Sequence, residues 1–236
     1  MNTLIQKVTR RTLSISLCLC VFVPLPKNKN MSHHIHSYLA LGDSYTIGEG
    51  LPLHENFPYQ LVQLLRAQSL HFYAPEIIAK TGWTTGELAE HLLHHQLNEK
   101  YDFVTLLIGV NNQYRGLSME DYKTDFEFLL KKAIHFTGGI AEHVFVLSIP
   151  DYSKTPFAKG MDTSKIEAGI DAFNKLNKEI SEQQKVHYIN ITEGTKKAGK
   201  DKKLLAADGL HYSASEYKIW AEELANAIVK LVKHRN

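Results

Sequence analysis

The sequence has little cysteine and no long apolar run. Both cysteines, Cys18 and Cys20, lie close to the N-terminus. The rest of the chain is therefore expected to hold no disulfide, no thiolate metal site and no cysteine nucleophile. No uninterrupted apolar stretch approaches the ~20 residues that a membrane-spanning helix needs. An integral membrane domain is therefore not expected.

Acidic residues are absent from positions 1–30, which hold five basic side chains: Lys7, Arg10, Arg11, Lys27 and Lys29. The whole chain has a formal charge of +2. Without those five, 22 basic side chains face 25 acidic ones, which leaves a formal charge of −3. This balance gives no reason to expect nucleic-acid binding, and the composition does not indicate an oligomeric state.

Residues 1–30 allow two interpretations. Basic residues followed by the apolar run Leu13–Pro26 resemble an export signal, but no small-x-small cleavage site follows. Alternatively, translation starts at Met31 and residues 1–30 are an extension of the gene model. We favour the second interpretation because the cleavage pattern is missing. It predicts a cytoplasmic protein, whereas the first predicts an exported one. Under both, the folded domain is expected over residues 37–233.

Five apolar segments alternate with amphipathic helical patterns along the rest of the chain. The expected strands are 38–41, 75–80, 101–109, 143–149 and 186–191. Such alternation predicts an α/β protein with three α/β/α layers around a five-stranded parallel sheet. The flavodoxin-like strand order 2-1-3-4-5 is expected. Helices are expected to begin after Asn56, Ser118, Ser164 and Ser213, since each residue type can cap a helix N-terminus.

Polar residues and glycine follow four of these strands. Ser44 follows the first strand, Gly82 the second and Asn111 the third, while Asp208 and His211 lie in the loop after the fifth. Because parallel strands end at one edge of a sheet, these residues are expected to meet there.

These residue types suit ester hydrolysis. A serine hydroxyl needs a base to remove its proton during attack, and histidine titrates near neutral pH. Asp208 can orient His211 and steady its imidazolium form. The backbone N–H groups of Ser44 and Gly82 and the side-chain amide of Asn111 can stabilise an oxyanion.

Four motifs carry a resemblance to a known family, in its order and over residues 37–233. They are Gly42-Asp43-Ser44, Gly82-Trp83-Thr84-Thr85, Gly109-Val110-Asn111-Asn112 and Asp208-Gly209-Leu210-His211. The chain resembles the GDSL-type esterases and lipases of the SGNH hydrolase family.

The resemblance implies a flavodoxin-like fold, with Ser44 as nucleophile, His211 as base and no metal or organic cofactor. It also implies a small-molecule ester substrate, such as a small acyl ester or an acetylated carbohydrate, cleaved through an acyl-enzyme. The sequence departs from the family at Asn112, where aspartate is usual, and at Tyr212, where proline is frequent. These departures leave the geometry of both loops open.

Two alternatives remain at this stage. One is a thioesterase or lysophospholipase of the same fold. The other is a non-catalytic module that binds a phosphate or nucleotide at the same edge of the sheet. The second is disfavoured because the helix after the first strand is expected only about ten residues after Ser44, whereas such modules place it directly after the strand.

Other residues near the site admit further roles. Trp83, Tyr114 and Arg115 are candidates for lining a substrate pocket, although Trp83 can equally pack over the core. Histidines gather at His33, His34 and His36 and again at His91, His94 and His95. Neither group contains the HExxH pattern. The second group is expected to be a solvated helix face, and no metal site is predicted.

Overall fold

The computed structural model describes residues 34–233, so the predictions for residues 1–30 and for His33 lie outside the described part. Its strands form one sheet in the order β2-β1-β3-β4-β5, and all neighbouring strands are parallel. The strands are β1 (Tyr38–Gly42), β2 (Glu76–Ala79), β3 (Phe103–Leu107), β4 (Val144–Leu147) and β5 (His187–Ile189). The predicted fold class and strand order are confirmed.

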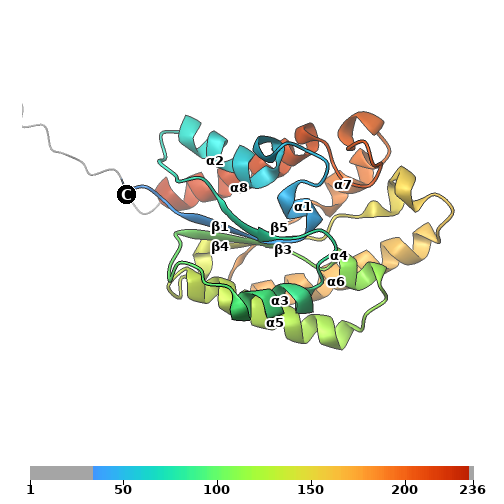
Figure 1. Ribbon diagram of the computed structural model, residues 1–236, viewed down its shortest axis with the longest axis horizontal. Coiled ribbons are helices and arrows are strands. Elements are labelled where there is room, and N and C mark those ends of the chain that lie inside the picture. The colour runs from blue at the N-terminus through green and yellow to red at the C-terminus, as the bar shows by residue number, and fades with distance from the viewer. Residues whose placement is uncertain (1–33, 234–236) are drawn as a thin grey trace, which may run out of the picture. The chain divides into compact units, whose positions relative to one another are not determined.

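Helices cover both faces of the sheet (Figure 1). Helices α2 and α8 pack on one face, and α3, α5 and α6 on the other. The α-helices are α1 (Ser44–Ile47), α2 (Phe57–Ala67), α3 (Thr85–His94), α4 (Val110–Tyr114), α5 (Met119–Phe136), α6 (Thr163–Gln183), α7 (Thr192–Ala198) and α8 (Ala214–Lys233). Short 3₁₀ helices occur at Leu53–Glu55, Ala141–His143, Tyr152–Lys154, Pro156–Ala158 and Lys202–Leu204. Within residues 34–233, no helix is long and apolar enough to cross a membrane.

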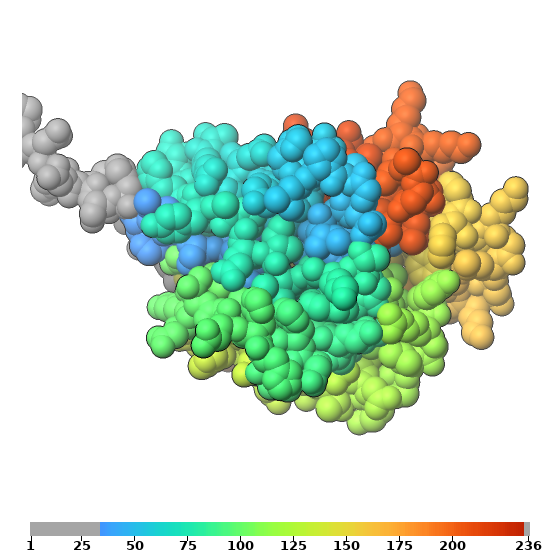
Figure 2. Space-filling view, in the orientation of Figure 1, coloured from blue at the N-terminus to red at the C-terminus, as the bar shows by residue number. Residues whose placement is uncertain are grey.

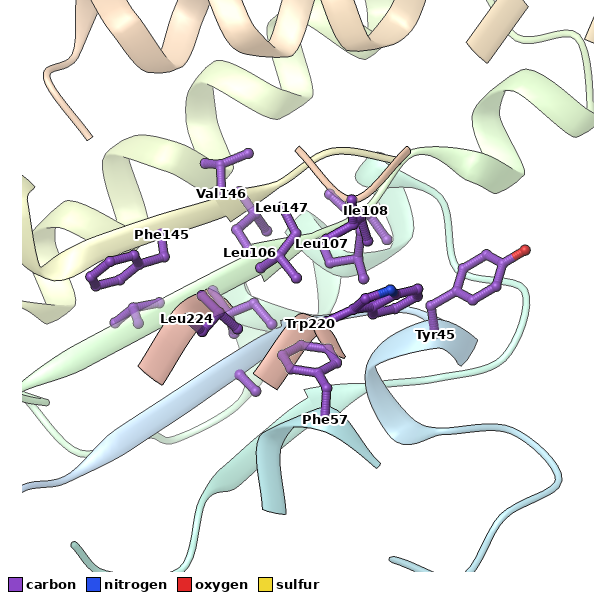
Figure 3. Close-up of a cluster of buried hydrophobic side chains, with 14 of the residues drawn as sticks. Tyr45, Phe57, Leu106, Leu107, Ile108, Phe145, Val146, Leu147, Trp220 and Leu224 are labelled. Carbon is purple, nitrogen blue, oxygen red and sulfur yellow. The ribbon is translucent and has the colours of Figure 1, made fainter. Parts of the chain in front are cut away.

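The core joins the sheet to the segment that carries Ser44. Trp220 of α8 lies between Phe57 of α2 and Tyr45 of α1 (Figure 3), with ring centroids 6.2 Å and 6.4 Å away. All three side chains are buried. Burying one such large side chain stabilises a fold by about 1.5–3 kcal/mol. The residue next to Ser44 is therefore fixed in the core of the domain.

Two of the four capping predictions hold. The side chains of Asn56 and Ser118 each accept a hydrogen bond from the backbone N–H three residues later, at 2.9 Å and 3.0 Å. The prediction for Ser164 is wrong, because the carboxylate of Asp162 caps α6 and the helix begins earlier. Helix α8 begins at Ala214, directly after Ser213 as predicted, but the predicted side-chain cap is not made, because the buried Ser213 hydroxyl has no hydrogen-bond partner among the described residues.

The chain turns into helix sooner than predicted after β1. The single-turn helix α1 begins at Ser44 itself, although the first long helix, α2, starts only at Phe57. Gly42 permits this close turn. A Cβ atom there would lie 2.1 Å from the Thr46 hydroxyl oxygen and 2.4 Å from the Leu107 carbonyl oxygen. Glycine at this position thus lets α1 fold back onto the end of the sheet.

Candidate active site

The segments that follow the strands gather at one end of the domain. Helices α1, α4 and α7 lie there in Figure 1, beyond the carboxyl ends of β1 and β3. In the same view, Figure 2 shows segments near residues 50, 115, 158 and 205 meeting at this end. Residues far apart in the sequence therefore line one region, as open parallel sheets bring about.

Ser44, His211 and Asp208 form a continuous chain of hydrogen bonds. The Ser44 Oγ lies 2.9 Å from the His211 Nε2, and the His211 Nδ1 lies 2.5 Å from the Asp208 Oδ2. Ser44 and His211 are buried, at 5% and 6% exposed. With Nδ1 protonated and bonded to Asp208, the free Nε2 lone pair faces the serine hydroxyl. This arrangement can take up the hydroxyl proton.

Asp208 is fixed by its own loop. Its Oδ1 accepts hydrogen bonds from the backbone N–H groups of Leu210 and His211, at 2.9 Å and 3.0 Å. Burial alone raises the pKa of Asp208, but the hydrogen bonds from the His211 ring and from both backbone groups outweigh it and lower that pKa. The carboxylate therefore stays charged beside the imidazole, where it favours an imidazolium.

Tyr212 holds the histidine loop in place of the proline that the family resemblance led us to expect. Its ring is buried and packs edge-on against Trp220, with centroids 5.5 Å apart. Its hydroxyl donates to the Asp151 carbonyl at 3.2 Å. The backbone carbonyl of His211 accepts from Ala206 N–H at 2.8 Å. The loop is thus anchored on the core by a side chain.

Asp43 has a structural task of its own. It is 1% exposed, and its carboxylate caps α1 by accepting from the Tyr45 N–H at 3.0 Å. Burial raises the pKa of Asp43 to about 7. Among the described residues it makes no hydrogen bond to His211, so Asp208 is the carboxylate that orients the histidine.

Asn111 and Arg115 tie the glycine loop to the segment after β3. The Asn111 side-chain amide donates to the Trp83 carbonyl at 2.9 Å, and the Arg115 guanidinium donates to the Gly82 carbonyl at 2.6 Å. Glu87 accepts from the same guanidinium at 3.3 Å. Gly82 has φ +84°, a left-handed conformation that favours glycine. The peptide planes on both sides of Trp83 are therefore held.

Each of the three predicted oxyanion donors has an N–H bond without a partner among the described residues. The Asn111 amide has two N–H bonds and uses one on Trp83, which leaves the other available. The backbone N–H groups of Ser44 and Gly82 make no hydrogen bond within residues 34–233. These are the three donors that the sequence predicts for an oxyanion.

A small cavity opens beside Ser44. Its volume is about 110 Å³, and its polar lining comes from Ser44, Asn111 and His211. The rest of the lining is mainly apolar: Tyr45, Val110, Tyr114, Tyr152, Phe157 and Leu210. Tyr114, Tyr152 and Phe157 form an aromatic cluster with ring centroids 6.0–6.2 Å apart.

Sequence reasoning did not identify Tyr152 and Phe157, which come from the irregular loop after β4. No periodic pattern in that loop indicates which side chains turn toward Ser44. Of the three predicted pocket residues, Tyr114 lines the cavity and Arg115 holds Gly82. Trp83 does not line this cavity. Its ring packs against that of His91, 4.8 Å away.

The fold and this strand-end arrangement of serine, histidine and aspartate define an α/β serine hydrolase. The sequence profile of the GDSL-like Lipase/Acylhydrolase family matches residues 40–219, and the chain belongs to this family. The protein is therefore an enzyme that hydrolyses ester bonds, and nothing favours the non-catalytic alternative.

Solved structures show the same fold. TesA is 20% identical with a TM-score of 0.65, and the match covers 82% of this chain and 98% of TesA. The acetylxylan esterase Axe2 from Geobacillus stearothermophilus is 18% identical with a TM-score of 0.63, covering 83% and 93%. The esterase EstA from Pseudoalteromonas sp. is 21% identical with a TM-score of 0.59, covering 84% and 99%. No curated protein matches in sequence.

Proposed function

We propose that the protein hydrolyses esters of small carboxylic acids through an acyl-enzyme on Ser44. The hydrogen-bonded chain from Ser44 through His211 to Asp208 carries this proposal. Ser44 Oγ attacks the ester carbonyl while its proton passes to His211 Nε2. Asp208 holds the Nδ1–H and stabilises the imidazolium.

The negative charge that develops on the carbonyl oxygen needs donors. We assign this task to the N–H groups of Ser44 and Gly82 and to the free N–H of the Asn111 amide. The intermediate then collapses: the alcohol leaves with the proton from His211, and the acyl group remains on Ser44. A water that gives its proton to His211 releases the carboxylic acid and restores the serine.

The size of the cavity supports a short acyl chain. Its volume of about 110 Å³ is well below the roughly 300 Å³ at which pockets for larger ligands begin. Tyr114 is 53% exposed, and its ring offers flat apolar surface to the alcohol part of the substrate, whereas we assign the less exposed Phe157 ring, at 36%, to the acyl side of the cavity. An acetylated carbohydrate fits both features, and Axe2, a neighbour in fold, is described as an acetylxylan esterase.

A panel of p-nitrophenyl esters of increasing acyl length tests this proposal, together with an acetylated sugar, a thioester and a lysophospholipid. We expect the highest kcat/KM for acetyl or propionyl esters. Preference for a long acyl chain would contradict the short-acyl assignment, and preference for the thioester would replace ester hydrolysis by thioester hydrolysis.

Phe157→Ala tests whether the aromatic rim limits the acyl group. The substitution removes a partly exposed ring from the cavity lining, so the preferred acyl chain should lengthen. Tyr73→Ala is the matched control, because Tyr73 is an exposed aromatic residue, at 59%, outside this lining. An unchanged acyl preference in Phe157→Ala would exclude the rim as the limit.

A further inference from the structure

A second cluster of polar side chains lies at the opposite end of the sheet. His34 and His36 precede β1, and Asp102 precedes β3. Their nearest ligand atoms, one from each residue, all lie within 4.8 Å of one another. Extended chain rises by about 3.3 Å per residue, so roughly 20 Å separates His36 from Gly42, which lies beside the catalytic serine. Figure 1 shows β1 running between these two ends.

The local backbone explains why two histidines face one carboxylate. The segment before β1 is extended, since His36 forms a parallel bridge with Phe72. Residues two apart in an extended chain point to the same side, and the rings of His34 and His36 are 4.7 Å apart. Asp102 reaches them from the neighbouring strand in the sheet, 66 positions further along the chain than His36.

Asp102 is oriented for this role by Ser37. The Ser37 N–H and hydroxyl donate to its Oδ2 at 2.8 Å and 3.0 Å. The other oxygen, Oδ1, faces the histidines: it lies 2.7 Å from His34 Nε2 and 3.7 Å from His36 Nδ1. Hydrogen bonds from neighbouring groups orient metal-binding carboxylates in proteins in the same way.

A simple ion pair does not account for the whole cluster. An exposed pair between His34 and Asp102 explains the 2.7 Å contact. The His36 ring packs against Phe72 and Phe103, and its buried Nδ1 makes no hydrogen bond among the described residues. Its contact to Asp102 Oδ1, at 3.7 Å, is longer than a hydrogen bond. Buried polar atoms without a partner are rare and call for an explanation such as an ion.

We propose that His34, His36 and Asp102 form a binding site for a divalent transition-metal ion of the zinc type. Two imidazole nitrogens and one carboxylate oxygen are ligands that zinc accepts, with water as the fourth. Zinc bonds of about 2.0–2.1 Å place neighbouring ligand atoms roughly 3.3 Å apart. The two measured distances to Asp102 Oδ1, 2.7 Å and 3.7 Å, bracket this value.

The ion would fasten the segment before β1 to the start of β3. Binding of the ion is independent of ester hydrolysis, because the proposed site lies at the opposite end of the sheet from Ser44. No metal site was predicted from the sequence, because only histidines stand close together at positions 33–36 and no carboxylate lies near them in the chain. The carboxylate that completes the cluster comes from a distant strand.

Equilibrium dialysis of the full chain without an affinity tag against micromolar Zn²⁺ tests the proposal, with thermal unfolding as a second readout. We expect wild type to bind one equivalent and to gain in Tm. His34→Ala should lose both effects, and its exposed side chain, at 65%, makes folding of the variant secure. His36→Phe, which keeps an aromatic ring between Phe72 and Phe103, should lose them as well.

His94→Ala is the matched control. His94 is also an exposed histidine, at 74%, and contacts the carboxylate of Glu90 at 3.0 Å. This variant should still bind one equivalent with the wild-type gain in Tm. Absence of binding to wild type, or unchanged binding by His34→Ala, would overturn the proposal.

Discussion

Asn112 and Thr85, 27 positions apart, hold each other by two hydrogen bonds. The Asn112 Oδ1 accepts from the Thr85 N–H at 3.0 Å, and its Nδ2 donates to the Thr85 hydroxyl oxygen at 2.7 Å. The same hydroxyl donates its proton to Asp125 Oδ2 at 3.1 Å. This contact joins the asparagine segment to the helix that follows the glycine loop.

The contact explains why asparagine suits position 112. A hydroxyl has only one proton to donate, and Asp125 already accepts the proton of Thr85. An aspartate at position 112 would bring a second carboxylate against the Thr85 hydroxyl oxygen. That hydroxyl would have no proton left to donate to it. Asn112→Asp should therefore destabilise the fold by about 1–3 kcal/mol, measured by urea unfolding.

Asp125→Asn supplies the control for this prediction. An amide at position 125 relieves the competition between the two carboxylates, so the double variant should be more stable than Asn112→Asp alone. A double-mutant cycle measures this coupling directly. Additive effects of the two substitutions would contradict the explanation.

Asn111→Ala should reduce kcat by about 10²–10³, with a much smaller change in KM. The reason is that the free amide N–H is proposed to act on the oxyanion, which exists only during reaction. Part of the loss comes from release of the Trp83 carbonyl, which the same amide holds. An increase confined to KM would argue against the oxyanion role.

Arg115→Lys separates the two contributions, because Arg115 holds the neighbouring Gly82 carbonyl but does not line the cavity. Loosening the glycine loop in this way should lower kcat less than Asn111→Ala does. An equal loss in both variants would indicate that Asn111 acts through loop position alone.

Asp208→Asn should lower kcat by up to about 10⁴, because an amide facing His211 Nδ1 favours the tautomer that carries its proton on Nε2. That tautomer cannot accept the proton of Ser44. The amide oxygen of the substituted side chain can still accept from the backbone, so the loop should keep its shape. Asp201→Asn is the matched control, since Asp201 also caps a backbone N–H, at 2.9 Å, in the same region. Comparable losses in both variants would exclude the orienting role.

Stability should depend on pH through Asp43. Burial raises its pKa from 3.8 to about 7, so the protonated form favours folding. This contribution is fully present below the unfolded pKa and is lost as pH rises through 7. From about pH 5 to pH 8.5, the free energy of unfolding of wild type should fall by about 2–3 kcal/mol more than that of Asp43→Asn, whose side chain keeps a capping oxygen. Urea unfolding at both pH values checks this, and parallel losses in the two proteins would contradict it.

The sheet could be predicted from the sequence because each strand is an apolar run and the segments between the runs have helical periodicity. The candidate residues Ser44, Gly82 and Asn111 could be predicted because they stand at strand ends. Tyr152 and Phe157 could not be predicted from the sequence, because their positions depend on the fold of the loop after β4. In that loop Asp151 is buried and lies 3.9 Å from Lys196 of α7. Contacts between distant elements of this kind leave no local pattern.

The cluster of His34, His36 and Asp102 also depends on contacts between distant elements. His34 and His36 are visible as neighbours in the sequence, but Asp102 joins them only when β1 and β3 pair. Spacing along the chain predicts sites built on one element. A site shared between strands needs the register of the sheet.

Labelling with a fluorophosphonate probe tests the central claim most directly, because such a probe reacts with a serine whose hydroxyl is activated by a base. Peptide mapping by mass spectrometry should place a single adduct on Ser44. Labelling should be lost in Ser44→Ala and strongly slowed in His211→Ala, while circular dichroism shows both variants folded. An adduct on another residue, or undiminished labelling and ester hydrolysis in Ser44→Ala, would contradict Ser44 as the nucleophile.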